Sequence, residues 1–457
     1  MEASLILSPE TWAKHTFGGT DLGDVRRTKR AVSVAASLMR NPSASLPQQM
    51  VSHAGLKAAY SLFAEEDVSY TALVAHHWQE TRDAAAQQAL VLMVQDTTEL
   101  DYTVHPTTTN LGPIGNGGGR GLLLHTMLAV VPHPRQVLGI AFQEPFRRIP
   151  APEGERQTER FQRQREWQVW SRAVQALDRP SPSCLRVHVG DRGSDIFDYM
   201  DACLKQGDHF LIRATCNRRV RDVDNKPKKL FDFVRTWPRQ GDKLVDVPAH
   251  KHCPARQATV SLAYGRVTLV PPQRSQRREP LTAWVVHVWE MNPPAAVKGP
   301  LEWVLLTSVE TTTVEAAWER VDWYTCRWLV EDYHQCLKTG CSIEKRQLQD
   351  GERLMRLLGF LALVAVWLLQ LRDMARRTPD CLASAALPRE VVELVAVLAR
   401  VPAASLTVQR FWWEVARQGG YLGRRRDGPP GWKTLWRGWL HIQTLLQGVL
   451  LAKHLPP

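Results

Sequence analysis

Residues 89–98 read Ala-Leu-Val-Leu-Met-Val-Gln-Asp-Thr-Thr, six apolar residues followed at once by four polar ones. An unbroken apolar run of this length is typical of a strand that is buried on both faces of a sheet. We therefore predict a buried strand that ends at residues 95–98 and places Asp96 at the carboxyl edge of the sheet. Residues 122–131 and 136–142 predict two further strands beside it.

A second strand of the same kind precedes Asp191. Residues 185–190 read Leu-Arg-Val-His-Val-Gly, and the charged, helix-compatible segment 153–177 comes before them. A strand, a helix and a strand in this order indicate an α/β core. Asp96 and Asp191 would then lie at one sheet edge, where paired carboxylates can hold a hard cation such as Mg²⁺. A single strand-end aspartate is more often a turn or a helix cap, so the pair needs a third ligand.

The third ligand is expected in residues 323–340, which contain neither Gly nor Pro before Gly340 and so predict a helix that ends there. At 100° per residue, one stripe about 21 Å long would carry four side chains: Tyr324, Arg327, Glu331 and Lys338. Glu331 could complete the metal site while the other three bind neighbouring phosphates. A solvated charged face has the same spacing, so the pattern alone leaves both interpretations open.

The composition fits a soluble, multidomain protein with a polyanionic partner. The 457 residues suggest two or three domains, and the formal charge of +12 favours nucleic acid, although a merely basic soluble protein fits equally well. The longest apolar run, residues 357–369, would rise only about 20 Å as a helix against a bilayer core of about 30 Å, so it predicts a buried helix and no membrane span. Eight cysteines without a C-x-x-C pair, and no secretory leader, favour a reduced, cytoplasmic setting.

The pattern changes along the chain in a way that predicts three domains. Residues 1–70 are helical in pattern, residues 71–373 hold the strands and the acidic residues, and residues 374–457 are again helical. Within the central domain, a β insertion is expected at about 225–310. Its strands are 258–270, with a turn at Tyr264–Gly265, and then 282–289 and 302–306.

The helix signature resembles that of the insertion-sequence-four family of D-D-E transposases. The family spaces Tyr, Arg, Glu and Lys as this chain spaces Tyr324, Arg327, Glu331 and Lys338. The contexts of Asp96 and Asp191 are also similar, and the resemblance runs from Trp12 to Trp439. It implies a ribonuclease-H-like α/β core with a β insertion, between an N-terminal helical DNA-binding domain and a C-terminal helical domain. It further implies Asp96, Asp191 and Glu331 as catalytic ligands of two Mg²⁺ ions, which Mn²⁺ can replace, and strand cleavage through a DNA hairpin.

The same resemblance implies contacts with double-stranded DNA, both transposon ends and target. Tyr324, Arg327 and Lys338 would contact phosphates. The other implied DNA-binding side chains are Trp303 and Trp328 at the hairpin, Arg192 and Arg213 in the core, and Arg26, Arg27 and Arg30 in end recognition. Without the resemblance, Trp303 would be assigned to the core and the arginines to solvated surfaces. The basic residues 218–229 would add unspecific phosphate contacts or form a mobile loop, and the helices around 432–451 would form a homodimer or pack within the monomer.

Two residues depart from the family pattern, Gln335 and Lys57, where its members have a basic and an acidic residue. They bear on DNA affinity and end sequence, not on the class of reaction. The glycine-rich residues 112–121 lack the ending of a phosphate-binding P-loop, so we expect a flexible loop there. Two alternatives stay open: a plain metal-dependent nuclease, and a DNA-binding regulator that inhibits transposition without cutting.

Overall fold

The apolar run at residues 89–94 lies in the central strand of the core. The core strands are β1 (Leu90–Asp101), β2 (Gly112–Ile114), β3 (Gly119–Val131), β4 (Gln136–Phe146), β5 (Leu185–Gly190) and β6 (His209–Arg213). Strand β1 pairs antiparallel with β3 and parallel with β5, and β6 continues the parallel pair. The order β4-β3-β1-β5-β6 thus places an antiparallel trio beside two parallel strands. The computed structural model describes residues 8–452, apart from 51, 153, 157–164, 248–254, 274, 276, 295–296, 298, 378 and 425–426.

Strand β1 is longer than predicted. Its parallel pairing with β5 stops at Gln95 opposite Gly190, but its antiparallel pairing with β3 continues to Asp101. The long partner β3 satisfies the backbone of residues 96–101, so the polar residues do not end the strand. Asp96 therefore lies in mid-strand, at the place where the neighbouring strand β5 ends.

The predicted β insertion extends the same sheet. Its elements are β7 (Arg219–Arg221), β8 (Pro227–Lys229), α9 (Leu230–Val234), β9 (Gly241–Val247), β10 (Arg256–Leu269), β11 (Leu281–Glu290) and β12 (Glu302–Thr307). Because β12 pairs antiparallel with β6, the insertion continues the core sheet, which has twelve strands among the described residues. The predicted turn at Tyr264–Gly265 is wrong, since β10 runs straight through it. A Cβ on Gly265 would lie 3.0 Å from the Trp237 ring, so this glycine permits close packing.

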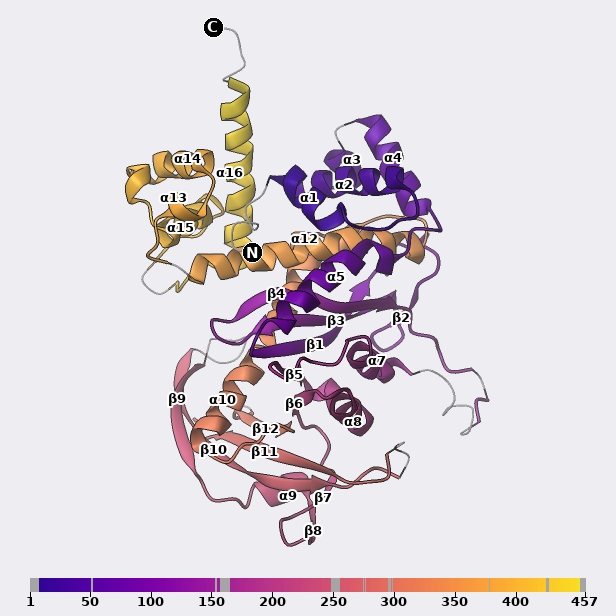
Figure 1. Ribbon diagram of the computed structural model, residues 1–457, viewed down its shortest axis with the longest axis vertical. Coiled ribbons are helices and arrows are strands. Elements are labelled where there is room, and N and C mark those ends of the chain that lie inside the picture. The colour runs from indigo at the N-terminus through magenta and orange to yellow at the C-terminus, as the bar shows by residue number, and fades with distance from the viewer. Residues whose placement is uncertain are drawn as a thin grey trace.

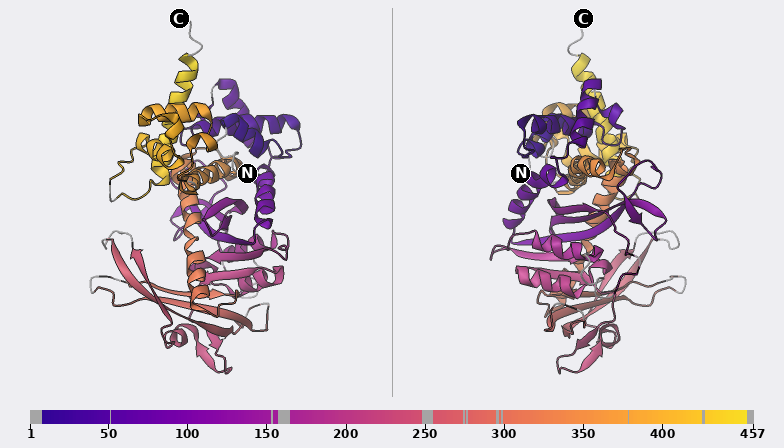
Figure 2. Two further views of the ribbon diagram at one scale, coloured as in Figure 1. Left: turned by 60° about the vertical axis from the view of Figure 1, so that its left-hand side comes forward. Right: turned by 90° about the vertical axis from the view of Figure 1, so that its right-hand side faces the viewer.

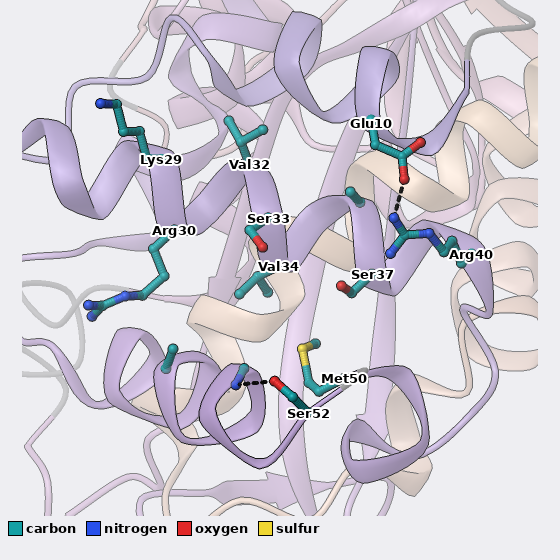
Figure 3. Close-up of a pocket in the computed structure, with 13 residues that line it drawn as sticks. Glu10, Lys29, Arg30, Val32, Ser33, Val34, Ser37, Arg40, Met50 and Ser52 are labelled. Atoms are coloured by element: carbon teal, nitrogen blue, oxygen red, sulfur yellow. Dashed lines mark hydrogen bonds and ion pairs between the residues drawn. The ribbon is translucent and has the colours of Figure 1, made fainter.

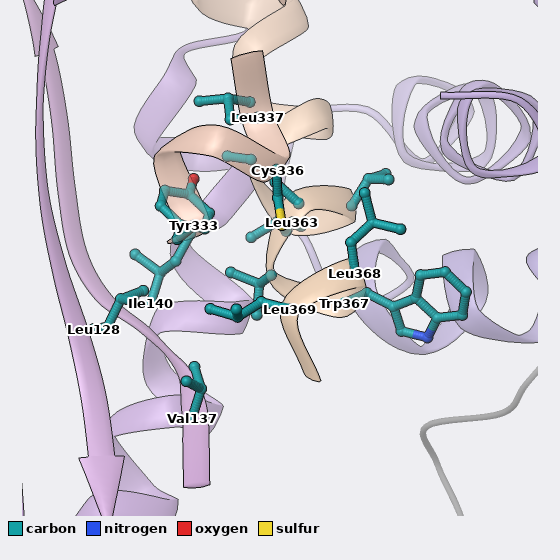
Figure 4. Packing of buried hydrophobic residues seen from close by; sticks show 14 of the residues in the cluster. Leu128, Val137, Ile140, Tyr333, Cys336, Leu337, Leu363, Trp367, Leu368 and Leu369 are labelled. Atoms are coloured by element: carbon teal, nitrogen blue, oxygen red, sulfur yellow. The ribbon is translucent and has the colours of Figure 1, made fainter. Parts of the chain in front are cut away.

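Helices cover both faces of the core sheet (Figure 1). One face carries α7 (Val169–Gln175) and α8 (Phe197–Gln206), and the other carries α5 (Tyr70–Ala86) and α12 (Gly351–Arg377). Figure 4 shows the second layer, in which Leu363 and Leu369 of α12 pack with Ile140 of β4. Residues 357–369 are buried throughout, as predicted. Among the described residues, no helix combines the length and the hydrophobicity needed to cross a membrane.

The segment 323–340 is not the single helix that the sequence predicts. Helix α10 (Val314–Thr325) ends before Arg327, helix α11 (Trp328–Gln335) follows, and residues Cys336–Gly340 form a π-helical turn closed by a 2.9 Å bond from the Cys341 N–H to the Cys336 carbonyl. A π turn holds more residues than an α turn, so it changes the direction in which the next side chains point. Lys338 lies inside this π turn, so the continuous helical stripe predicted for it with Tyr324, Arg327 and Glu331 is interrupted.

Helical modules lie at both ends of the described chain. The first contains α1 (Pro9–Phe17), α2 (Val25–Arg40), α3 (Leu46–Gln49) and α4 (His53–Ala64), and the second contains α13 (Ala383–Ala386), α14 (Arg389–Ala399), α15 (Val408–Gln418) and α16 (Trp432–Ala452). Both modules contact α12 and lie at the end of the molecule opposite the β insertion (Figure 2). The seven described cysteines form no disulfide with one another, and Cys253 lies outside the described residues.

Candidate active site

Three carboxylates from three elements share one electrostatic environment. Asp96 follows Gln95 on β1, and Asp191 follows Gly190 at the end of β5. Gln95 and Gly190 are paired in register, so the two aspartates come directly after one pair of neighbouring residues. Glu331 comes from α11, which packs against β1. Burial raises the pKa of Asp96 to about 7, the negative charge of Asp191 adds to this, and Glu331 contributes a smaller repulsion. The three predicted carboxylates therefore lie close enough to interact electrostatically.

Local geometry holds each aspartate in place. The Asp96 carboxylate accepts the Thr97 N–H at 2.8 Å, and the Asp191 carboxylate accepts the Gly193 N–H at 2.8 Å, which caps the short 3-10 helix η3 (Arg192–Ser194). Gly190 allows this tight turn, because a Cβ there would lie 2.4 Å from Ser194 Oγ. Strand β5 can thus turn sharply and still present Asp191 beside Asp96.

Glu331 is bound by Arg327. The Arg327 Nη1 atom donates to Glu331 Oε1 at 2.5 Å, and the side chains are 9% and 41% exposed, respectively. The same guanidinium lies 4.4 Å from the centre of the Trp328 ring and 5.9 Å from that of Tyr324. Arg327 therefore links the acidic cluster to a half-exposed tryptophan and to the buried Tyr324.

The donor set suits a hard divalent cation. All three groups are carboxylates. Burial and then repulsion from Asp191 raise the pKa of Asp96, and a bound cation would relieve this repulsion. Within the described ranges, no three Asp, Glu, His or Cys side chains already enclose a common point at metal-binding distance. The ion pair with Arg327 gives a physical reason, since it holds the Glu331 oxygen elsewhere.

An aromatic and basic surface adjoins the carboxylates. Trp303 of β12 makes an edge contact with Tyr324, with ring centres 5.2 Å apart, and Arg213 at the end of β6 lies 6.0 Å from the Trp303 ring centre. Trp328 is 53% exposed, which is unusual for so large an apolar side chain. Arg192 is exposed at the start of η3, directly after Asp191. Five of the predicted DNA-binding side chains thus surround the triad, together with Arg327.

Lys338 lies apart from this cluster. Its ammonium group is 3.4 Å from Glu344 and helps to lower the pKa of Asp101, whose largest influence is the hydrogen bond from Thr103. Asp101 is five residues beyond Asp96 on β1, or about 17 Å along an extended strand. The ion pair with Glu344 therefore engages the charge of Lys338 outside the group of three carboxylates.

The predicted end-recognition arginines lie on α2 in the N-terminal module. Arg26 and Arg30 are exposed, but Arg27 is held by Asp67 at 2.9 Å and Glu65 at 3.0 Å. Arg30 and Lys29 stand at one end of a groove of about 380 Å³ between α2 and α4, and the Arg40–Glu10 ion pair stands at the other (Figure 3). Arg26 and Arg30 are therefore better placed than Arg27 to reach DNA.

One of the expected surface arginines points inward. Arg218 forms a nearly buried ion pair with Asp195, and that carboxylate also accepts the N–H groups of Thr215 and Cys216 at 2.8 Å. Asp195 thus ties the chain after β6 to η3, and Arg218 is not a free phosphate ligand. The structure describes the rest of 218–229 as the exposed hairpin β7–β8, not as an irregular loop.

Four buried polar residues near the site are not among the residues predicted from the sequence: Gln95, His125, His188 and Asp208. Their signal is visible in the sequence, because each histidine interrupts an apolar strand and Gln95 directly follows one. Only the sheet register shows that these residues meet.

Two family models match the chain. Residues 9–68 match the model described as transposase DNA-binding, and residues 169–367 match the transposase DDE domain. The first covers α1–α4, and the second covers Asp191 and Glu331 but begins after Asp96. The protein is a DDE transposase, with a transposase DNA-binding domain ahead of its DDE domain. DDE transposase domains generally use divalent metal ions.

A solved structure is also similar: the cryo-EM structure of a piggyBac transposase synaptic complex with hairpin DNA. The similarity covers 98% of this chain and 79% of that one, with 10% sequence identity and a TM-score of 0.37.

Proposed function

We propose that the protein binds the terminal inverted repeats of a transposon, excises the element and joins its ends to target DNA. The observation that carries the proposal is the convergence of Asp96, Asp191 and Glu331 beside an aromatic and basic surface. We further propose that the protein is a member of the insertion-sequence-four family and is similar to the transposase of transposon Tn-five. This proposal is based on the spacing of Tyr324, Arg327, Glu331 and Lys338.

We also propose that the core is ribonuclease-H-like. The strand order β4-β3-β1-β5-β6, with three antiparallel strands beside two parallel ones, supports this assignment. The domains would then be residues 1–70, 71–373 and 374–457, with the β insertion between β6 and the helix that carries Glu331.

The proposed cofactors are two Mg²⁺ ions, or Mn²⁺ in their place, held by Asp96, Asp191 and Glu331. When bound, such ions stabilise the attacking and leaving oxygens of an in-line displacement and lower the pKa of water. The chain's own residues bind and orient the DNA. Arg327 and Arg213 would contact phosphates, and Trp303 or Trp328 would stack on a base extruded at the hairpin, which is worth about 1–3 kcal/mol.

The proposed reaction is a series of phosphoryl transfers. Water attacks a phosphorus at the transposon end, the bond to the 3′ oxygen breaks, and a 3′-hydroxyl and a 5′-phosphate result. The 3′-hydroxyl attacks the opposite strand, which closes a hairpin and releases the 3′-hydroxyl of the flanking DNA. A second water opens the hairpin, and the regenerated 3′-hydroxyl displaces a 3′ oxygen of the target strand.

We propose that the active species is a homodimer that holds two DNA ends. Helix α16 projects from the body of the molecule (Figure 1), and its outer half carries partly exposed Leu445 and Leu446 and the 44% exposed Val449. An apolar face of this kind fits a second copy of the chain. Light scattering of the protein with and without paired DNA ends would measure the mass of the complex.

The decisive experiment is cleavage of a labelled duplex that carries the element's own end, with Mg²⁺ or with chelator. Asp191→Ala removes one proposed ligand, and Glu315→Gln removes an exposed carboxylate elsewhere, on α10, as the matched control. We expect metal-dependent nicking and then a hairpin for the wild type and the control, and neither product for Asp191→Ala. End binding without cleavage in every case would favour the inhibitor, and cleavage without joining to added target DNA would favour a plain nuclease.

A further inference from the structure

A line of buried polar side chains crosses the sheet directly under the proposed metal site. Side chains alternate along a strand, so Gln95 and Thr97 point to the face of β1 opposite Asp96. The contacts are Thr97 Oγ1 to His125 Nδ1 (2.8 Å), His125 Nε2 to Gln95 Oε1 (3.1 Å), Gln95 Nε2 to His188 Nδ1 (2.8 Å), and His188 Nε2 to Asp208 (2.8 Å). Arg186 completes the line with a 2.7 Å bond to Asp208.

The line is dry. Gln95, His125 and His188 are fully buried, and the rings of Trp170 and Tyr199 cover them, with edge contacts to His125 and His188. Burial lowers the pKa of His125 to about 3 and also lowers that of His188, so both imidazoles are neutral at pH 7. A neutral imidazole has one donor nitrogen and one acceptor nitrogen, which restricts how the line can be protonated.

The negative charge of Asp208 determines which atom donates in each hydrogen bond of the line. Burial acts to raise the pKa of Asp208, but hydrogen bonds from His188 and Arg186 lower it overall, so the group is an anion and only accepts. The His188 Nε2–H must therefore donate to Asp208, and its Nδ1 must accept from the Gln95 amide. The Gln95 oxygen then accepts from His125 Nε2–H, and His125 Nδ1 accepts from the Thr97 hydroxyl. Only one arrangement of the protons therefore gives every hydrogen bond of the line both a donor and an acceptor.

We infer that Gln95, His125, His188 and Asp208 are positioning residues, which hold the two catalytic aspartates where a pair of cations can bind. The line joins β1, β3, β5 and the residue before β6, and Gln95 pairs in register with Gly190 just before Asp191. Asp96 and Asp191 repel each other, and metal sites need their ligands held within about 0.5 Å. A line whose bonds all have one direction resists both strand slippage and side-chain rotation.

Stability alone does not account for such a line. Replacing a buried polar network by apolar residues of similar volume is often neutral or stabilising, whereas leaving one member unpaired is costly. The network therefore constrains the choice of conformation more than it adds to stability. This inference rests on the proposed function, because the positioned groups are the proposed metal ligands.

The first test compares variants that break the line with variants that do not. Gln95→Leu keeps the shape and removes all of the Gln95 bonds, and Thr97→Val removes only the hydroxyl that Thr97→Ser retains. Thr307→Val is the matched control, because it removes another buried hydroxyl of the same sheet, which donates to Phe210 at 2.7 Å. Mn²⁺ binding by calorimetry, end binding, single-turnover cleavage and thermal unfolding would be measured for each.

We expect Gln95→Leu and Thr97→Val to weaken Mn²⁺ binding and to slow cleavage by roughly tenfold or more, with end binding within about twofold of wild type. Thr97→Ser should recover most of the cleavage, and Thr307→Val should lose only stability. Wild-type cleavage and Mn²⁺ affinity in both line-breaking variants would overturn the inference alone. A wild-type protein that neither binds Mn²⁺ nor cleaves DNA would overturn the proposed function and this inference with it.

A second readout does not depend on activity or on folding of a variant. Long-range ¹H–¹⁵N spectra of wild-type protein with labelled histidines distinguish the two tautomers of each neutral ring. Both His125 and His188 should carry the proton on Nε2. A proton on Nδ1 of either ring would break the proposed order and overturn the inference.

Discussion

At the scale of single residues, Arg327 has two possible partners. It binds Glu331 and lies against Trp328 and Tyr324, so it is close both to a proposed metal ligand and to the surface expected to meet DNA. A phosphate that took the guanidinium would leave Glu331 free to bind a cation. DNA binding and metal binding would then favour each other, because each removes one partner of the ion pair.

Arg327→Ala should therefore have opposite effects on metal affinity and on cleavage. A partly exposed ion pair is worth about 0.5–1 kcal/mol, so Mn²⁺ binding without DNA should tighten about two- to fivefold. Cleavage should fall at least about tenfold, because a charged contact to phosphate is lost. Calorimetry at pH 8 and single-turnover cleavage check the two effects, with Lys243→Ala, which breaks an exposed pair with Asp322, as the control. Weaker Mn²⁺ binding in Arg327→Ala would show that Arg327 supports the ligands instead of competing for one.

At the scale of elements, the site depends on two strands of unequal length. Strand β5 stops and turns at Gly190 while β1 continues, so Asp191 leaves the sheet beside an Asp96 that stays in it. The glycine matters because Ser194 and Trp170 fill the space where a side chain would be. The π turn after α11 contains Lys338, whose ammonium group lies 3.4 Å from Glu344.

Gly190→Ala should displace the turn that carries Asp191. The new Cβ would lie 2.4 Å from Ser194 Oγ and 3.0 Å from Trp170, and overpacking of this kind costs about 1–3 kcal/mol. We expect a lower unfolding temperature and at least about tenfold slower cleavage, because a shift near 1 Å is enough to impair a positioned ligand. Gly431→Ala, where nothing lies within 4 Å of the new Cβ, serves as the control. Normal cleavage at the wild-type unfolding temperature would show that the turn can adjust.

At the scale of the whole molecule, two arginines, the buried Arg346 and the partly buried Arg356, join the DNA-binding module to the catalytic core. Arg346, which follows the π turn, donates to the carbonyls of Pro42 and Ala44 in the module and to that of Cys341 in the core. Arg356 of α12 reaches the carbonyls of Phe63 and Val68. The stacked rings of Phe17 and Phe360, 5.0 Å apart, add an apolar contact between the two parts.

Arg346→Met should uncouple end binding from cleavage. The substitution fills a similar volume but leaves three carbonyls without their donor, which costs about 1–3 kcal/mol for each buried group that stays unpaired. We expect faster hydrogen exchange at residues 42–49, retained end binding, and slower cleavage. Arg40→Met, which breaks the pair with Glu10 inside the module, is the control. Unchanged exchange at residues 42–49 would show that other contacts hold the module in place.

The sequence by itself predicted the strands, and its resemblance to a transposase family predicted the three carboxylates and the class of chemistry. An apolar run followed by an aspartate and the Tyr-Arg-Glu-Lys spacing are local patterns, and local patterns specify which element forms and what it carries. The same information predicted strands within a few residues, and it predicted the burial of 357–369. The sequence-based prediction was wrong at two places. At Tyr264–Gly265 the strand packs against Trp237 and continues without a turn, and at Arg327 the predicted single helix is divided into α10 and α11.

Only the tertiary structure decided which of these groups meet. Lys338 forms an ion pair with Glu344, Arg218 forms one with Asp195, and Arg27 forms ion pairs with Glu65 and Asp67. Sheet register brought Gln95, on β1, into contact with His125 and His188, which lie 30 and 93 residues away along the chain. The physical reason is that pairing between distant strands, and the burial that follows, fix the partners of each polar group, and no local pattern contains that information.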